Sequence, residues 1–374
     1  MKTPLPLEIS RRKFLRGASL VAGALAWPGV RAAEAPAGSP PPKKLGIALA
    51  GLGSYATGEL APALAETQYC QLAGVVTRSP AKGAQWAAKY GFPEKNIYTP
   101  DTMGRMAENP DIDIVYVVTP NGLHAEYAIL AAMAGKHVIS EKPLANTVAE
   151  CDAMIRACAA AKRQLAVGYR LHFDPYHQEM VRLAQAGQLG PFTKMAGENG
   201  FTMDGEQWRM EKKLSGGGPL MDMGIYVVHA ACMAAGANPV AVTAKERVKT
   251  RPDFFKTTEE ALDWTMEFPG GATAQCMTSY VQNVGHFHAE GAKGWIDLRP
   301  AFDYRGLRVT TSAGPLNFPR LRQQSAHMDA IAKSIIDGTA TPVPGELGRR
   351  DMVIIEGIYK SAALEGKKVE LDYT

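Results

Sequence analysis

The sequence of 374 residues predicts an α/β domain with a parallel sheet, followed by an α+β domain with an open-faced, mostly antiparallel sheet. Three observations carry this prediction. Apolar strand-like runs alternate with helical patterns as far as residue 168. The glycine motif GLGSYA joins the first of these runs to a helix. Segments of alternating polarity, typical of half-buried antiparallel strands, then recur between residues 192 and 298.

Length and composition support a globular protein of two domains. The chain exceeds one typical hydrophobic core, and it is 46% hydrophobic and 21% charged. A formal net charge of +4, with no lysine/arginine block after the N-terminal region, gives no support to nucleic-acid binding. The five cysteines have no metal-ligand spacing, so we predict no metal site and no disulfide framework.

The N-terminus has the pattern of an export signal. Residues 10–15 read SRRKFL, and a short apolar run follows that is too short to span a bilayer well. We therefore expect residues 1–33 to be a twin-arginine signal peptide, read by the twin-arginine export machinery. Residues 34–43 are Pro-rich and should form an extended arm. The predicted location of the mature chain is the periplasm, with no membrane span.

The first domain is predicted over residues 44–168, and its first strand runs into a dinucleotide-binding motif. Gly51 and Gly53 belong to the pattern G-x-G-x-x-A, which follows a buried strand and opens a helix. The first glycine permits a tight turn, and the second lets the backbone approach a pyrophosphate. With Ser54 and Tyr55 at the helix N-terminus, these residues predict a Rossmann-type phosphate site.

The second strand, residues 71–76, ends without the acid that usually holds the adenosine 2′-hydroxyl. Thr77, Arg78 and Ser79 stand there instead, and Lys82 follows one turn later. An arginine and hydroxyls bind a 2′-phosphate with charge-assisted hydrogen bonds, which favours NADP over NAD. The plain alternative is that Arg78 is a solvated loop residue.

Two further strands of this domain end in polar motifs. The strand at 113–118 is followed by Thr119, Asn121 and a helix containing His124, and the strand at 137–140 by Glu141 and Lys142. Ligands bind at the carboxyl edge of open parallel sheets, so these side chains should converge. After Pro143, Asn146 or Thr147 should cap a helix over residues 148–161, with Glu150 completing a capping box.

The second domain is predicted over residues 169–374. It begins with a GYRLHF segment containing Arg170, and helices are expected at 175–186, 323–336 and 349–364. We expect a six-stranded sheet with one face covered by the first domain. Its predicted strands are 192–199, 240–248, 261–268, 272–280, 286–291 and 294–298.

A glycine-rich segment at 215–218 leads into the most informative helix. Asp222 and Tyr226 are four residues apart, so they share a helix face. Arg209 precedes them in a QWR segment. The pair suits proton transfer, although a tyrosine bonded to an aspartate for stability alone is the plain alternative. His286 and His288 share a strand face, but no third ligand at a recognisable spacing suggests a metal.

Taken together, the GLGSYA, TPN-x-x-H and EKP motifs resemble those of the Gfo/Idh/MocA oxidoreductase family. The GYR-x-H, QWR and MD-x-GIY segments resemble its glucose–fructose oxidoreductase branch in particular. The resemblance implies hydride transfer between a nicotinamide and a sugar carbon, with Tyr226 moving the proton and Lys142 stabilising its phenolate. Asp222 would hold a sugar hydroxyl or orient Lys142. Arg170 and Arg209 would hold sugar hydroxyls, although a structural ion pair is the plain alternative for each, and Arg170 would also border the cofactor.

The resemblance and the export signal together predict a sugar oxidoreductase that carries tightly bound NADP. One sugar, an aldose, would be oxidised at C1 to the aldonolactone, and a second would be reduced to the alditol in a ping-pong cycle. A homo-oligomer through the C-terminal sheet is expected. Three alternatives stay open. They are a conventional sugar or polyol dehydrogenase with exchangeable cofactor, an NAD-dependent glycoside hydrolase of the same fold, and a non-catalytic sugar-binding protein.

Overall fold

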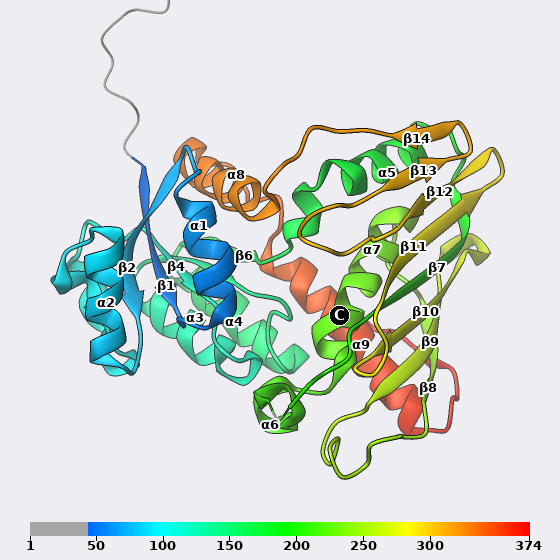
Figure 1. Cartoon of the computed structure of the whole chain (residues 1–374), viewed down its shortest axis with the longest axis horizontal. Helices are drawn as coiled ribbons and strands as arrows, with labels where there is room; N and C mark the ends of the chain where they lie inside the picture. The colour runs from blue at the N-terminus through cyan, green and yellow to red at the C-terminus, as the bar shows by residue number, and fades with distance from the viewer. Residues whose placement is uncertain (1–43, 206) are drawn as a thin grey trace, which may run out of the picture. The chain divides into compact units, whose positions relative to one another are not determined.

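A computed structural model describes residues 44–205 and 207–374, and its first sheet is fully parallel. The strand order is β3-β2-β1-β4-β5-β6, the doubly wound order of dinucleotide-binding folds (Figure 1). Its strands are β1 (Leu45–Ala50), β2 (Cys70–Val76), β3 (Ile97–Tyr98), β4 (Ile114–Val117), β5 (His137–Ser140) and β6 (Leu165–Val167). The predicted α/β domain is confirmed. The predicted signal peptide and Pro-rich arm lie outside the described residues.

Helices connect these strands largely where the sequence predicts them. The connections are a π-helix η1 (Ala56–Leu60) continuing into α1 (Ala61–Leu64), α2 (Pro80–Tyr90), the 3-10 helices η2 (Glu94–Asn96), η3 (Pro100–Glu108) and η4 (Asn121–Leu123), α3 (His124–Met133) and α4 (Val148–Ala160). Thr147 and Glu150 form the expected capping box at the start of α4, and this box holds the chain just after the EKP turn.

In the part of the chain that the structure describes, the second sheet has nine strands rather than the predicted six. Their order is β14-β13-β12-β11-β7-β10-β9-β8-β15, and β7 and β10 are the parallel pair within it. The six predicted strands are β7 (Phe192–Gly200), β8 (Ala241–Glu246), β9 (Ala261–Glu267), β10 (Thr273–Ser279), β11 (Val284–Gly291) and β12 (Gly294–Leu298). The additional edge strands are β13 (Val309–Thr311), β14 (Gly314–Leu316) and β15 (Val369–Glu370). Such short strands are too brief to show a clear alternation.

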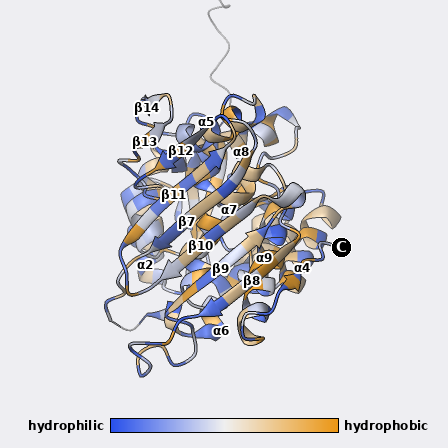
Figure 2. Ribbon diagram, turned by 90° about the vertical axis from the view of Figure 1, so that its right-hand side faces the viewer, coloured by the Kyte–Doolittle hydropathy of each residue, from blue (hydrophilic) through white to orange (hydrophobic). Residues whose placement is uncertain are grey.

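Helices from the same half of the chain cover one face of this sheet, which corrects the expectation that the first domain does so. They are α5 (Pro175–Gln185), α7 (Ile225–Ala235) and α9 (Gly345–Ala363), with α7 packed on β7 and α9 on β8 (Figure 1). The segment Lys212–Ala235 is long and apolar enough for a membrane span by composition, but 72% of its apolar window is buried here. Figure 2 looks onto the strands of this sheet.

Of the last two long helices, α8 (Gln323–Asp337) contacts the first sheet and α9 contacts both sheets. In α8, the Ser325 hydroxyl donates to the Ala63 carbonyl at 3.0 Å, and the Asp329 carboxylate accepts from the Tyr69 backbone N–H at 2.8 Å. The N-terminal part of α9 packs on α4 and β6. A chain division between residues 168 and 169 stays a prediction, because the C-terminal helices return to the first sheet.

Candidate active site

A cleft of about 890 Å³ lies between the carboxyl edge of the first sheet and the segments around α7. Most of the predicted site residues border it. They are Gly51, Gly53, Ser54, Tyr55, Thr119, Asn121, His124, Glu141, Lys142, Arg170, Arg209, Asp222 and Tyr226. The structure therefore brings together residues more than 150 positions apart in the sequence.

The predicted 2′-phosphate residues lie just outside this cleft. Thr77, Arg78 and Ser79 follow β2, the strand next to β1, and Arg78 and Ser79 are exposed. Lys82 lies in the first turn of α2, and its Nζ donates to the carbonyl of Leu52 at 2.5 Å. This bond ties the predicted phosphate-binding segment to the glycine motif.

The glycine motif has the geometry of a phosphate cradle. Gly51 has a φ of +102°, and a Cβ there would lie 2.8 Å from the Val118 carbonyl oxygen, so a side chain is excluded. A Cβ at Gly53 would meet no heavy atom within 4 Å, so the backbone borders open space. A helix begins directly after it and presents its N-terminus to the cleft. These residues fit the pyrophosphate of a dinucleotide.

His124 joins the two polar motifs of the first sheet. One ring nitrogen, Nδ1, lies 2.9 Å from the Pro143 carbonyl oxygen, and the other, Nε2, lies 2.9 Å from that of Thr119. Burial lowers the pKa of His124, so the neutral ring is favoured between the two loops. The motifs T-P-N-x-x-H and E-K-P thus lie side by side because the histidine of one contacts the proline of the other.

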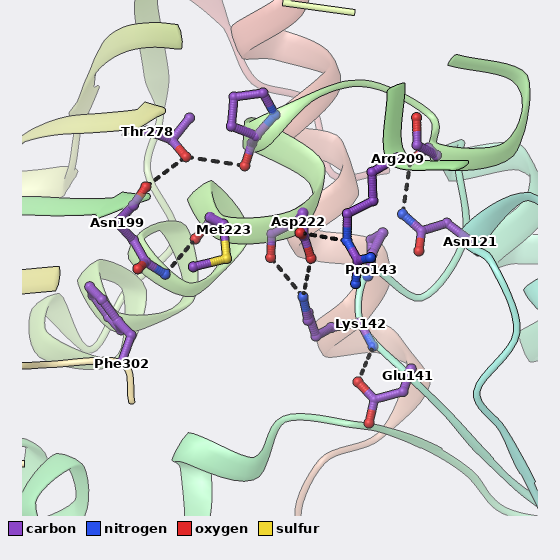
Figure 3. A network of polar contacts seen from close by, with 12 residues as sticks. Asn121, Glu141, Lys142, Pro143, Asn199, Arg209, Asp222, Met223, Thr278 and Phe302 are labelled. Carbon is purple, nitrogen blue, oxygen red and sulfur yellow. Dashed lines mark hydrogen bonds and ion pairs between the residues drawn. The ribbon is translucent and has the colours of Figure 1, made fainter. Parts of the chain in front are cut away.

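Lys142 forms a charged cluster with the second half of the chain (Figure 3). Its ammonium donates to the Asp222 backbone carbonyl at 2.6 Å and to Asp222 Oδ1 at 3.1 Å. Arg209 Nε donates to Asp222 Oδ2 at 2.9 Å. Burial opposes ionisation of Asp222, but the two cations hold its pKa well below the usual range. Asp222 therefore orients Lys142, one of its two predicted roles.

The backbone around Asp222 departs from an α-helix. Leu220–Gly224 form a π-helix, η7, directly before α7. Glu259 accepts the backbone N–H groups of Gly218 and Leu220 at 2.8 and 3.1 Å and so fixes the start of this segment. Short π-helical turns within helices are frequent at functional sites. Here the turn contains the aspartate that Lys142 contacts twice.

The phenol ring of Tyr226 lies between two cations. Lys142 Nζ is 4.6 Å from the ring centroid, and the Arg170 guanidinium carbon is 4.9 Å from it. Burial lowers the pKa of Lys142, but the tyrosine and Asp222 outweigh it and raise that pKa overall, so Lys142 stays charged. The buried Arg170 guanidinium donates to the Phe302 carbonyl oxygen at 2.5 Å and also donates to the Gln323 side-chain oxygen.

The family resemblance places the loop at 299–319 on the rim of a sugar pocket, but sequence reasoning singled out none of the residues there that complete the cleft. Tyr304 stacks on Tyr55 with ring centroids 5.8 Å apart, and Arg305 pairs with Glu59 at 3.3 Å. Tyr304 also covers the guanidinium of Arg170 at 4.3 Å. The aromatic and charged run Phe302–Asp303–Tyr304–Arg305 is a weak signal, because nothing local says which segment it meets. These contacts close the cleft above the glycine motif.

The histidines form no metal centre among the described residues. No group of three or more potential ligands that could hold a metal ion occurs in the part of the chain that the structure describes. His286 Nε2 and His288 Nδ1 both face Asp297 Oδ1, at 2.5 and 3.2 Å, on β11 and β12. They lie in the second sheet, and neither borders the large cleft.

Comparison with known proteins agrees with this geometry. Residues 45–169 match the family described as "Oxidoreductase family, NAD-binding Rossmann fold", and residues 177–297 match the "GFO/IDH/MocA C-terminal domain". The D-xylose 1-dehydrogenase [NADP(+)] of Haloarcula marismortui is 28% identical over 337 residues, 87% of this chain and 93% of that protein.

Solved structures agree as well. The aldose-aldose oxidoreductase of Caulobacter crescentus, complexed with glycerol, is 41% identical with a TM-score of 0.86. The match covers 88% of this chain and 100% of that one. A levoglucosan dehydrogenase in complex with NADH and levoglucosan shares the fold at 23% identity and a TM-score of 0.76, over 88% of this chain and 100% of that one.

Proposed function

This chain belongs to the Gfo/Idh/MocA oxidoreductase family, and we propose that it is an exported, NADP-dependent sugar oxidoreductase that retains its cofactor. It oxidises an aldose at C1 to the lactone and reduces a second sugar to the alditol. The observation that carries the proposal is the Tyr226 phenol, held in the cleft between Lys142 and Arg170.

The chain's own residues account for the proton in this reaction. Gly51 and Gly53 would hold the dinucleotide, whose nicotinamide would supply the hydride chemistry. The Tyr226 oxygen accepts the proton of the C1 hydroxyl in the first half-reaction and returns it to the carbonyl oxygen in the second. The positive charges of Lys142 and Arg170 stabilise the phenolate that accepts the first proton and that forms again when the second sugar is protonated. Asp222 holds Lys142 in place.

A sugar suits the rest of the cleft. Arg209 and Asp222 present charged donors and acceptors there, and Trp208 borders the same space as a flat apolar surface. The likeness to an aldose-aldose oxidoreductase supports an aldose as the first substrate and a second sugar as the acceptor. Oxidation followed by reduction on one retained cofactor is a ping-pong cycle.

NADP specificity is proposed from the end of β2. Arg78 and Ser79 are exposed where an acid usually stands, and Lys82 is tied to the glycine motif. Arg78→Ala should weaken binding of NADPH about 10- to 100-fold, because a charge-assisted contact with the 2′-phosphate is lost, and leave NADH binding unchanged. Fluorescence titration of both nucleotides measures the change. An equal loss for both would contradict this assignment.

Export and assembly are proposed from the sequence and the second sheet. The twin-arginine pattern of residues 10–15 supports export to the periplasm, where free NADP is scarce and a retained cofactor is an advantage. The face of the second sheet away from α7 bears Trp295, which is 36% exposed, and we propose this face as the contact between subunits.

One experiment tests the central proposal. The dialysed protein should carry a nicotinamide, and adding an aldose should produce the near-ultraviolet absorbance of the reduced ring. A second sugar should then remove that absorbance. Turnover that requires added NADP would favour a conventional dehydrogenase, an alternative supported by the D-xylose dehydrogenase likeness. Turnover of nitrophenyl glycosides would favour the hydrolase instead.

A further inference from the structure

Glu141 is a buried carboxylate that borders the cleft, and the proposed proton transfer does not use it. Its side chain is 8% exposed. The Tyr116 hydroxyl donates to Oε1 at 2.7 Å, and the Lys142 backbone N–H donates to Oε2 at 3.2 Å. Both groups are donors, so both favour the ionised carboxylate, although burial raises the pKa of Glu141.

The protein makes room for this carboxylate. A Cβ at Gly168 would lie 2.7 Å from Glu141 Oε1 and 2.9 Å from Oε2, so any larger residue would displace it. Within residues 44–205 and 207–374, Glu141 forms no ion pair, because the ammonium of Lys142 is directed to Asp222. Its charge is therefore not neutralised by a direct partner.

The charges around it explain why a carboxylate is needed there. Lys142, Arg170 and Arg209 are three cations on the cleft lining, and Asp222 and Asp303 are two carboxylates on it. Glu59 and Arg305 pair with each other at the opposite rim. Without Glu141, the cations on the cleft lining would outnumber the carboxylates by one. An oxidised nicotinamide ring is itself a cation, so that environment would repel it.

The location of the carboxylate fits such a role. Glu141 follows β5 directly and adjoins Lys142, which contacts both Asp222 and the ring of Tyr226. It also influences Tyr55 on the glycine motif, whose pKa is raised by burial first and by Glu141 next. Glu141 therefore faces the space between the phosphate cradle and the proton-transferring phenol, and dinucleotides lie across that space in folds of this topology.

We propose that Glu141 sets the reduction potential of the bound cofactor by stabilising the cationic, oxidised nicotinamide. This inference rests on the proposed function, because it assumes a nicotinamide in the cleft. As a consequence, the driving forces of the two half-reactions are balanced against each other. The carboxylate makes the oxidised cofactor harder to reduce by the aldose and makes the reduced cofactor a better hydride donor to the second sugar.

The test is the potential of the bound cofactor in the full-length protein, titrated against mediator dyes with no sugar present. Glu141→Gln keeps the shape and removes the charge. At a fixed solution potential, the ratio of reduced to oxidised cofactor should rise about 10- to 100-fold. This equals an upward shift of the reduction potential of about 30 to 60 mV for two electrons. Glu141→Asp keeps the charge and should shift the ratio less than about threefold.

Glu260→Gln is the matched control, because Glu260 is also buried but binds the backbone N–H groups of Thr250 and Arg251, outside the cleft lining. It should leave the potential unchanged. Should Glu141→Gln fail to fold, Tyr116→Phe removes a donor that offsets the carboxylate charge and should give a smaller shift in the opposite direction. An unchanged potential in these variants, or an equal shift in Glu141→Asp, would overturn the proposal. A wild-type protein that turns over no sugar, while Glu141→Gln shows the expected potential shift, would instead count against the proposed function.

Discussion

The two walls of the cleft are built on different principles. The wall formed by the first sheet consists of loops that directly follow strands, and its main groups are backbone at Gly51 and Gly53 and the motif side chains at 119–124 and 141–142. The opposite wall is assembled from segments far apart in sequence, including Arg170, Asp222 and Tyr304. The first wall suits binding of a constant group, whereas the second suits chemistry and substrate choice.

If the second wall carries the chemistry, the largest effect on turnover is expected from a change at Tyr226. Tyr226→Phe removes one oxygen and keeps the ring between Lys142 and Arg170. Turnover should fall about 100- to 10,000-fold, the typical contribution of a positioned acid or base. Cofactor content, measured by absorbance after dialysis, should stay within about twofold of the wild type, because the phosphate cradle is untouched. Wild-type turnover in this variant would remove the proposed role of the phenol.

The second prediction concerns the charged cluster that joins the walls. Asp222→Asn removes the partner of two cations whose side chains are 10% and 32% exposed. Leaving two cations unpaired at a mostly buried site should lower the free energy of unfolding by about 2 to 3 kcal/mol, somewhat less than for a fully buried pair. Urea denaturation measures this loss.

An exposed ion pair in the second sheet is the control for that experiment. Asp263 pairs with Arg247, and their side chains are 47% and 40% exposed. Asp263→Asn should cost less than about 1 kcal/mol, as surface pairs generally do. Equal losses at the two positions would mean that the charged cluster contributes no more to the free energy of unfolding than a surface pair does.

The contrast between the walls also explains what the sequence could predict. Gly51, Lys142 and the capping box at Thr147 follow local rules, since a strand, a turn and a helix each leave a signature within about ten residues. The Asp222–Tyr226 spacing was readable for the same reason. Contacts such as Tyr304 on Tyr55 depend on how two distant segments meet, and no short pattern encodes that.

The same reasoning applies to the fold. The six longer strands of the second sheet alternate in polarity and were predicted, whereas β13, β14 and β15 have two or three residues and carry no period. The face covered by α5, α7 and α9 was misassigned to the first domain, because amphipathic helices show that they are buried but not against which sheet.

The third prediction concerns His327, which lies on α8. Its Nε2 lies 3.0 Å from the Val167 carbonyl, and burial lowers the pKa of His327 to about 4. An unfolded histidine titrates near 6.5, so the stabilisation is complete above that pH and is lost as the pH falls toward 4. Near pH 5 this costs about 2 kcal/mol relative to neutral pH.

His327→Gln keeps a donor for the Val167 carbonyl and does not titrate. Between about pH 7 and pH 5, the unfolding free energy of the variant should fall less steeply with pH than that of the wild type. The difference in slope should correspond to close to one proton. The pKa values of His137 and His172 are also lowered to about 4, so acid sensitivity should be reduced rather than abolished. Parallel stability curves for variant and wild type would show that His327 does not titrate as proposed.

The smallest effect is expected where the second wall reaches over the first. Tyr304 is 39% exposed and stacks on Tyr55, and its ring also covers the guanidinium of Arg170. Tyr304→Ala should speed cofactor loss about 3- to 10-fold, because a stacked pair and a cation–π contact contribute about 1 kcal/mol. Tyr304→Phe keeps both contacts and should retain the cofactor like the wild type. Repeated ultrafiltration with nucleotide absorbance measures retention. If the alanine variant also keeps its cofactor, enclosure comes from the first wall alone, and the second wall serves only the chemistry at Tyr226.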